Sequence, residues 1–175
     1  HRLGRDEEWE QLRRSDGALK ALEQAKREGL VRFLGVTGHY DPAVLTRAIT
    51  EYEFDTILMA LNCADPHYLP FTERLLPVAN RKNMGVIAKK IPARGRLFRE
   101  GGLRSMKDAM QWVLTQPVST VIVGCDSIEQ LEENVAIAAD FEPLGGPAMR
   151  RISALTAGYA KEAQFYKKGT RHRGG

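Results

Sequence analysis

The stretch Thr56-Ile57-Leu58-Met59-Ala60-Leu61 is an almost unbroken apolar run, and it points to the fold class. A strand with one face in water alternates apolar and polar residues, whereas a parallel strand covered on both faces does not. Similar runs start near residues 31, 84 and 118, and a segment with apolar residues at helical spacing lies between each run and the next. Buried strands that alternate with amphipathic helices predict an α/β fold with a parallel sheet.

Capping residues mark the expected helices. The segment 17–28 has apolar residues at helical spacing and is followed by Gly29, a typical helix stop. Asp41-Pro42 reads as an N-cap followed by proline at the first helical position, so a helix is expected over residues 43–52.

Later in the chain, Pro77 is expected to kink a helix over residues 71–81, and a helix over 106–115 precedes the fourth strand. Ser127 and Gln130 have the spacing of a capping box, with a buried stripe expected at Leu131, Val135 and Ala138. An amphipathic stretch over 148–165 follows.

Composition bounds the class of protein. The 175 residues are 43% hydrophobic and 27% charged, which is typical of a soluble globular chain with a sizeable core. No apolar stretch approaches the roughly 20 residues that cross a bilayer, so no membrane partner is expected. The cysteines Cys63 and Cys125 are too few for a disulfide framework or a zinc site, which favours a cytoplasmic location. No metal site is predicted.

The net charge of +4 comes from the end of the chain. Residues 150–175 contain 7 basic and 1 acidic residue, whereas residues 1–149 contain 19 basic and 21 acidic residues. We expect a folded unit over residues 1–166 and a basic flexible tail over 167–175. Because the tail lacks interleaved aromatic residues, nucleic acid is not an expected partner.

Four motifs in order resemble the aldo-keto reductase family. A helix that ends in Lys26-Arg27-Glu28-Gly29 leads into Arg32-Phe33-Leu34-Gly35-Val36-Thr37, and Met84-Gly85-Val86-Ile87-Ala88 is followed by Arg94-Gly95. Trp112 to Gly124 and then Glu129-Gln130-Leu131-Glu132-Glu133-Asn134 are similar to the family's eighth strand and last helix. The resemblance covers about residues 17–144.

The resemblance implies a (β/α)8 TIM barrel, of which this chain supplies roughly the last four βα units. It further implies an NAD(P)-dependent oxidoreductase that transfers a hydride between a nicotinamide cofactor and a small carbonyl or alcohol substrate. The family's catalytic Tyr, Lys and Asp lie in the N-terminal half of the barrel, so the chain alone is expected to be inactive. His1 matches the family's catalytic His or is a residue without such a role.

At the nicotinamide end, the resemblance implies roles for Thr37 and Asn62 as contacts of the carboxamide. Gly38 stands where the family has Asn, and Lys89 stands where an aromatic side chain stacks on the nicotinamide. Lys89 could instead face a phosphate, although a solvated side chain at a strand end is the alternative.

At the other end, Arg94 and Arg96 resemble the clamp for the diphosphate, and Gln130, Glu133 and Asn134 match residues that hold the adenosine. A polar helix face is the alternative for the last two. The expected cofactor is NADP, with NAD possible, because Gly124 and Gln130 replace the Lys and Arg that NADP-binding members commonly have.

A second function also fits these residues. The departures at Gly38 and Lys89 suggest a non-catalytic module that binds a nicotinamide nucleotide and senses redox state or mediates an interaction. In both cases the missing N-terminal half of the barrel is an expected partner, since four strands leave two open sheet edges.

Overall fold

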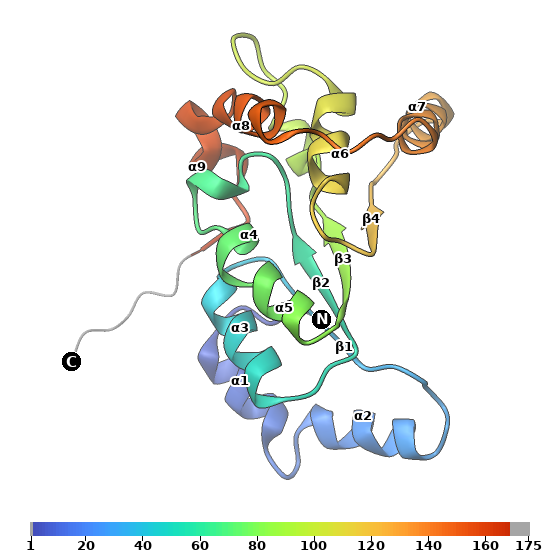
Figure 1. Cartoon of the computed structure of the whole chain (residues 1–175). Coiled ribbons are helices and arrows are strands. Elements are labelled where there is room, and N and C mark those ends of the chain that lie inside the picture. The colour runs from blue at the N-terminus through green and yellow to red at the C-terminus, as the bar shows by residue number, and fades with distance from the viewer. Residues whose placement is uncertain (1, 169–175) are drawn as a thin grey trace, which may run out of the picture.

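A four-stranded parallel sheet, in the order β1-β2-β3-β4, forms the centre of the computed structural model, which describes residues 2–168 (Figure 1). The strands are β1 (Gly35–Gly38), β2 (Thr56–Ala60), β3 (Gly85–Lys89) and β4 (Thr120–Ile122). Each pairs in parallel with the next, for example Val36 with Ile57 and Ile57 with Val86. Helices connect successive strands, so the predicted α/β fold with a parallel sheet is confirmed.

The remaining elements surround this sheet. Two helices precede β1: α1 (Asp6–Arg13) and α2 (Ala18–Arg27). The connecting helices are α3 (Pro42–Glu51), α4 (Phe71–Arg74), α5 (Leu76–Arg81) and α6 (Met106–Leu114). After β4 come α7 (Ile128–Ala139), α8 (Gly146–Ala154) and α9 (Ala160–Ala163). Short 3-10 turns are η1 (Asp65–His67), η2 (Ala93–Gly95) and η3 (Ala157–Tyr159).

Helices cover one face of the sheet and leave the other accessible. In β2 and β3 the buried residues alternate with partly exposed ones, as in Ile57 and Val86 against Leu58 and Ile87. Helices α3, α5 and α6 contact β1, β3 and β4. Within residues 2–168 the sheet is therefore covered on one face, as expected of four barrel strands, which leave their inner face uncovered. In a closed barrel the uncovered face would be the interior.

The two edge strands are shorter and more exposed than their apolar sequences predicted. β1 begins only at Gly35, and the preceding Leu30 and Phe33 are exposed. β4 spans three residues, and Ile122 at its end is 54% exposed. Each edge strand has a paired strand on one side alone within the described sheet, and in β1 the Thr37 carbonyl also accepts from the Leu3 amide at 2.7 Å.

Several predicted helix boundaries are confirmed. The Asp41 side chain accepts a hydrogen bond from the Ala43 amide at 2.9 Å, with Pro42 in the first turn of α3. Gly29 follows α2 with φ of 72°, a conformation that glycine adopts without strain. Leu75 separates α4 from α5, next to Pro77, as expected of a proline-interrupted helix.

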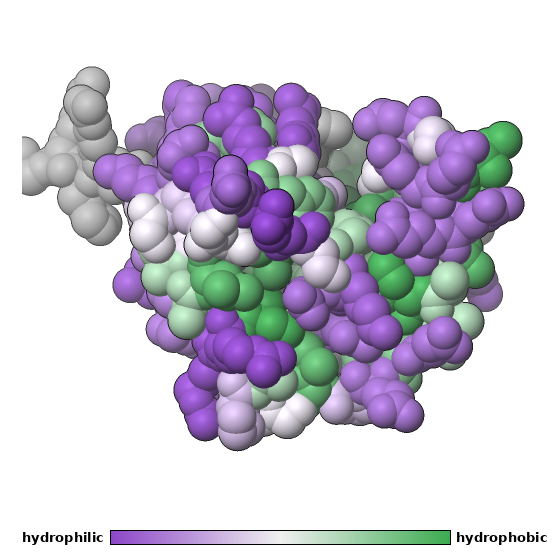
Figure 2. All heavy atoms as spheres, turned by 90° about the horizontal axis from the view of Figure 1, so that it is seen from above, coloured by the Kyte–Doolittle hydropathy of each residue, from purple (hydrophilic) through white to green (hydrophobic). Residues whose placement is uncertain are grey.

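Helix α7 is rotated relative to the prediction. The expected buried stripe is exposed, with Leu131 at 52% and Val135 at 59%, whereas Asn134 and Ile137 face inward. Figure 2 shows apolar surface on the right, the side on which Figure 1 draws α7 and β4. The helical spacing of the apolar residues thus predicts the helix correctly but does not predict which of its faces is buried.

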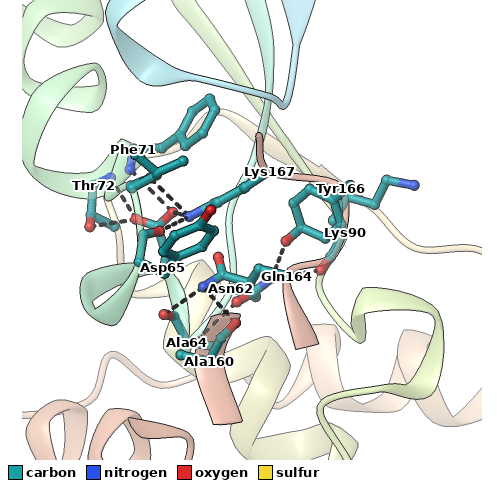
Figure 3. A network of polar contacts seen from close by, with 12 residues as sticks. Asn62, Ala64, Asp65, Phe71, Thr72, Lys90, Ala160, Gln164, Tyr166 and Lys167 are labelled. Atoms are coloured by element: carbon teal, nitrogen blue, oxygen red, sulfur yellow. Dashed lines mark hydrogen bonds and ion pairs between the residues drawn. The ribbon is translucent and has the colours of Figure 1, made fainter. Parts of the chain in front are cut away.

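The C-terminal segment folds back onto the loop that follows β2 (Figure 3). Lys167 Nζ lies 2.5 Å from Asp65 Oδ1, and both side chains are fully buried. Gln164 Nε2 donates to the Ala64 carbonyl at 2.8 Å, and Asn62 Nδ2 donates to the Tyr166 hydroxyl at 2.7 Å. We call Asn62, Asp65, Gln164, Tyr166 and Lys167 the C-terminal clamp. Lys167, expected as the first residue of a flexible tail, is thus part of the packed fold, and residues 169–175 lie outside the described residues.

Two general features concern possible partners. Among residues 2–168, no helix is both long and apolar enough to cross a membrane. The same part of the chain has no group of three or more His, Cys, Asp or Glu side chains arranged to hold a metal ion.

Candidate functional site

Two adjoining cavities lie at the carboxyl ends of β3 and β4. The first, of about 340 Å³, is lined by residues that include Arg94, Met106, Gln130, Glu133 and Asn134. The second, of about 500 Å³, is lined by Lys89, Lys90, Pro92, Arg94, Ile122, Gly124 and Asp126. Pro92, Arg94, Gly124 and Asp126 line both, so the two form one groove that runs from β3 to α7. Ligand sites of parallel α/β proteins lie at this end of the strands.

The capped start of α7 forms one wall of the groove. The Ser127 hydroxyl accepts from the Gln130 amide at 3.3 Å, and Gln130 Oε1 accepts from the Asp126 amide at 2.8 Å. The predicted capping box is therefore present, with the reciprocal bond one residue earlier than expected. The hydroxyl of Ser127 also lowers the pKa of Glu129. The positive end of the helix dipole faces this wall.

Asn134 is the deepest polar group of the first cavity. Its Nδ2 donates to Cys125 Sγ at 3.3 Å, whereas its buried Oδ1 has no hydrogen-bond partner in the described part of the chain. A buried amide oxygen without a donor costs about 1 to 3 kcal/mol. This oxygen is consequently available to an N–H group of a ligand.

On the open face of the sheet, Lys89 and Thr37 are joined. Lys89 is half-buried, and its Nζ donates to Thr37 Oγ1 at 2.8 Å, across the intervening β2. Gly38 follows Thr37 with no room for a side chain, because a Cβ there would lie 2.8 Å from Leu45 Cδ1 and closer still to the Leu3 carbonyl. Packing thus accounts for glycine at the position where the resembling family has Asn.

His39 and Lys90 stand beside this pair. Burial and the positive charges of Lys89, Lys90 and Arg2 lower the pKa of His39 to about 4, so the imidazole is neutral at pH 7. Its Nδ1 is buried and lacks a hydrogen-bond partner in residues 2–168. Burial, followed by the charge of Arg94, lowers the pKa of Lys90.

The loop after β3 places two arginines differently. Arg94 has φ of 57° and lines both cavities, whereas Arg96 lines neither and stacks over the Phe165 ring at 4.3 Å. The loop has positive φ at three successive residues, Ala93, Arg94 and Gly95. Of the two predicted clamp residues, Arg94 is therefore the one at the groove.

Asn62 does not project into the groove. It is fully buried, its Nδ2 donates to the Lys90 carbonyl at 3.1 Å and to Tyr166, and its Oδ1 accepts from the Ala64 amide (Figure 3). The role predicted for Asn62, a contact to the nicotinamide carboxamide, is not available in this arrangement because both ends of the amide are already bonded.

The structure thus gathers most of the predicted cofactor residues in one place. Five of them line the groove: Lys89, Arg94, Gln130, Glu133 and Asn134. Thr37 contacts it through Lys89, Asn62 and Arg96 are engaged elsewhere, and His1 lies outside the described residues. Lys90 and Asp126 also line the second cavity, as their positions after the predicted third and fourth strands indicate.

The cysteines have different environments. Burial raises the pKa of Cys63 to about 12, so its thiol stays protonated and is a poor nucleophile. Cys125 is exposed, and its Sγ accepts a hydrogen bond from Asn134 Nδ2.

Sequence comparison finds relatives of about twice the length. No protein-family model matches the chain. It is 29% identical over 156 residues to L-galactose dehydrogenase of Arabidopsis thaliana, an alignment that covers 73% of this chain and 48% of that protein. It is 24% identical over 157 residues to an uncharacterised oxidoreductase of Bacillus subtilis, covering 70% and 50%. The chain spans about half the length of the curated relatives it matches.

Solved structures identify the fold. An aldo-keto reductase from Bacillus halodurans in its holo form superposes with a TM-score of 0.63 at 22% identity, covering 91% of this chain and 59% of that one. The glycerol dehydrogenase of Gluconobacter oxydans superposes with a TM-score of 0.59 at 21% identity, covering 81% and 54%. The fold is that of part of an aldo-keto reductase barrel. The resemblance found in the sequence motifs is thereby confirmed, and the open face of the sheet corresponds to the barrel interior of these aldo-keto reductases.

Proposed function

We propose that this chain provides the cofactor-binding half of an NAD(P)-dependent oxidoreductase of the aldo-keto reductase type. The observation that carries the proposal is the groove itself. Five residues that match the family's cofactor positions, and that come from β3, the loop after it and α7, line two adjoining cavities. An extended dinucleotide needs a continuous site of this kind.

The groove has the chemistry that a dinucleotide requires. Diphosphate oxygens pair with guanidinium groups, and Arg94 stands where the two cavities meet. The adenine amino group is a hydrogen-bond donor, and Asn134 Oδ1 is a buried acceptor without a partner within residues 2–168. These residues fit the cofactor at its middle and at its adenosine end.

Each residue then has a positioning role. Arg94 holds the diphosphate, Gln130 fixes the first turn of α7, and Glu133 with Asn134 holds the adenosine end. Thr37, held by Lys89, stands on the barrel-interior side, where the nicotinamide would lie. A bound nicotinamide cofactor supplies the hydride that reduces a carbonyl or is regained from an alcohol.

Cofactor preference depends on the region between Gly124 and Gln130. We expect NADP, with NAD as the alternative. A Cβ at Gly124 would meet open space, so a larger side chain is tolerated there. Introducing basic groups with Gly124→Lys and Gln130→Arg is expected to strengthen NADPH binding about tenfold relative to NADH, because only NADPH carries the 2′-phosphate.

A complete site needs further strands. The free edges of β1 and β4 and the exposed apolar residues near them, Phe33, Ile122, Leu131 and Val135, fit four additional strand–helix units that would close the barrel. We propose these units, the N-terminal half of a barrel, as the partner of this half. They would supply the proton-transfer groups and most of the pocket for a small carbonyl or alcohol substrate.

The direct test is a fluorescence titration of the chain with NADPH and NADH. Arg94→Ala and Asn134→Ala are each expected to weaken binding about tenfold or more, because each removes a group that contacts the cofactor. Arg104→Ala is the matched control, since Arg104 is exposed and outside both cavities. Absence of binding in the parent chain, or equal losses in all three variants, would refute the proposal.

The alternative function is a nicotinamide-nucleotide-binding sensor without catalysis. It is favoured by Gly38 and Lys89, which depart from the family at the nicotinamide end. Turnover of an aldehyde panel by the chain combined with the other half-barrel separates the two functions. Cofactor binding with turnover supports the oxidoreductase, and cofactor binding without turnover supports the sensor.

A further inference from the structure

Three cations share the second cavity, and none of them is neutralised. Lys89, Lys90 and Arg94 line this cavity, whose single acidic lining residue is Asp126. Among residues 2–168, no carboxylate forms an ion pair with any of the three. Elsewhere the chain pairs partly buried lysines with acids, as in Lys26 with Asp55 and Lys82 with Glu53.

The electrostatic effects within this cluster are repulsive. Burial and the charge of Lys90 lower the pKa of Lys89. Burial and the charge of Arg94 in turn lower that of Lys90. His39, which burial and the same lysines keep neutral, adds a buried ring nitrogen without a hydrogen-bond partner in the described part of the chain. Lys89 and Lys90 are partly buried and Arg94 is exposed, and the rings of Tyr166 and Phe165 lie 5.7 Å from Lys90 Nζ and 5.9 Å from Arg94 Cζ. Water and these rings offset part of the repulsion, and a bound anion would offset more of it.

The position of Lys89 indicates which anion fits. Lys89 lies in register with Ala60 on one side and Ile122 on the other, in the top row of the open sheet face. Its bond to Thr37 Oγ1 uses one of three ammonium hydrogens and fixes the side chain, which leaves two donors. Arg94, which borders both cavities, is the cation placed for the cofactor's diphosphate, whereas Lys89 stands on the barrel-interior side.

We propose that Lys89 and Lys90 form an anion subsite that binds a carboxylate or phosphate group of the substrate. The substrate class of the proposed oxidoreductase would then be acidic carbonyl compounds or alcohols, such as oxo acids or phosphorylated sugars. The assignment of this anion to a substrate rests on the proposed function. The anion subsite itself rests on the geometry of the cavity.

His39 is a built-in reporter for the subsite. An NMR pH titration of the imidazole protons of the whole chain is carried out with and without saturating malonate or inorganic phosphate. A bound anion offsets the charges of Lys89 and Lys90, so the pKa of His39 is expected to rise by about one unit. The His67 resonances are expected to be the same with and without the anion, because His67 contacts Ser153 and lines neither cavity.

Three variants assign the effect to Lys89. In Lys89→Met the anion no longer shifts the His39 titration, and in Lys89→Arg, which keeps the charge, it still does. Lys107→Met is the matched control, because Lys107 is exposed on α6 and lines neither cavity. Failure of both anions to move the His39 titration in the parent chain overturns the proposal.

Chemical labelling provides a second readout. Pyridoxal phosphate condenses with an unprotonated lysine amine, with loss of water, and borohydride then delivers a hydride to fix the imine as a secondary amine. Lys89 or Lys90 is expected to be the first lysine modified in mass spectra, and malonate is expected to slow its modification at least fivefold. Uniform modification of the exposed lysines would contradict the subsite.

The cofactor titration separates the two proposals. If NADPH and NADH do not bind but the His39 effect persists, the proposed function fails and the anion subsite stands. If the cofactor binds and, at saturation, abolishes the effect of malonate, the subsite belongs to the cofactor's diphosphate and the substrate assignment is overturned. If malonate still shifts the pKa of His39 when the cofactor is saturating, the assignment of the subsite to the substrate is supported.

Discussion

The C-terminal clamp and the groove differ in whether their basic side chains have an acidic partner. In the clamp, the buried Lys167 is matched by Asp65 and by the carbonyls of Tyr68 and Leu69, at 2.8 and 3.0 Å. Asp65 in turn accepts from the Phe71 and Thr72 amides. Across the same end of the sheet, Lys89, Lys90 and Arg94 share a cavity without an acidic partner among the described side chains.

This difference separates structural from functional polar groups. Most buried polar groups that only stabilise the fold have partners, because an unpaired one costs about 1 to 3 kcal/mol; in the clamp, Gln164 Oε1 is an exception. Asn134 Oδ1 and His39 Nδ1 also lack a partner within residues 2–168, and Asn134 in addition lines the first cavity, where a ligand could reach it. Removing groups from each region should therefore have different consequences.

The largest effect is expected in the clamp. Asp65→Asn leaves Lys167 buried without its counter-charge and should lower the free energy of unfolding by about 3 to 5 kcal/mol, measured by urea denaturation. Lys82→Met is the control, since its partner Glu53 is 85% exposed and the loss should stay below about 1 kcal/mol. Similar losses of unfolding free energy in the two variants would show that the buried ion pair of the clamp is no more stabilising than an exposed one.

The next test compares two faces of α7. Ile137→Ala should cost about 2 to 4 kcal/mol, because Ile137 is 8% exposed and packs in the core. Val135→Ala, on the exposed face of the same helix, should change the free energy of unfolding by less than about 0.5 kcal/mol. If the two losses are equal in the chain alone, the outer face of α7 is covered in solution. Addition of the other half-barrel should raise the cost of Val135→Ala.

A pH dependence is expected from His39. Its pKa is about 4 in the folded chain against 6.5 ordinarily, so the unfolded chain binds the proton first as pH falls. Stability is therefore full above pH 6.5 and decreases as the pH falls toward 4. The partial exposure of the ring reduces the effect to about 1 to 2 kcal/mol. His39→Phe should flatten the curve of urea midpoint against pH in this window, and an unchanged slope would show that His39 titrates normally.

The smallest effect concerns the wall of the groove. Ser127→Ala removes the N-cap of α7 and should cost about 1 kcal/mol. Ser105→Ala, at the cap of α6, has the same bond to an amide, from Asp108 at 3.2 Å, and serves as the matched variant. Both should lose similar stability, but Ser127→Ala alone should also weaken cofactor binding. Equal cofactor affinities would mean that the start of α7 does not contact the ligand.

Local signals in the sequence predicted the helices and the order of strands well. Asp41, Pro42, Gly29 and Ser127 act within a few residues, and their roles hold in the structure. Proline at 77 likewise marked the break between α4 and α5. Such features depend on backbone geometry that is set nearby, so a single sequence is enough to find them.

What covers each element depended on distant contacts and was less predictable. Leu131 and Val135 have the periodicity of a buried stripe, yet they are 52% and 59% exposed. Lys167 reads as part of a basic tail, yet Asp65, about a hundred positions earlier, buries it. The use of Asn62 by Tyr166 is also a contact between distant segments. The sequence pattern indicates whether a side chain tends to be buried. Whether it is buried depends on a segment that is distant in the sequence.

The two ends of the described chain meet at the same place. The Leu3 amide donates to the Thr37 carbonyl at 2.7 Å, and the Lys168 amide donates to the Tyr40 carbonyl at 3.1 Å. Neighbouring termini are the usual requirement for circular permutation. A permutant that links residue 168 to residue 3 through a short glycine linker, and opens the chain in the exposed turn at Gly101, would keep all four strands and the clamp intact. It would also move the new termini away from the end of β1.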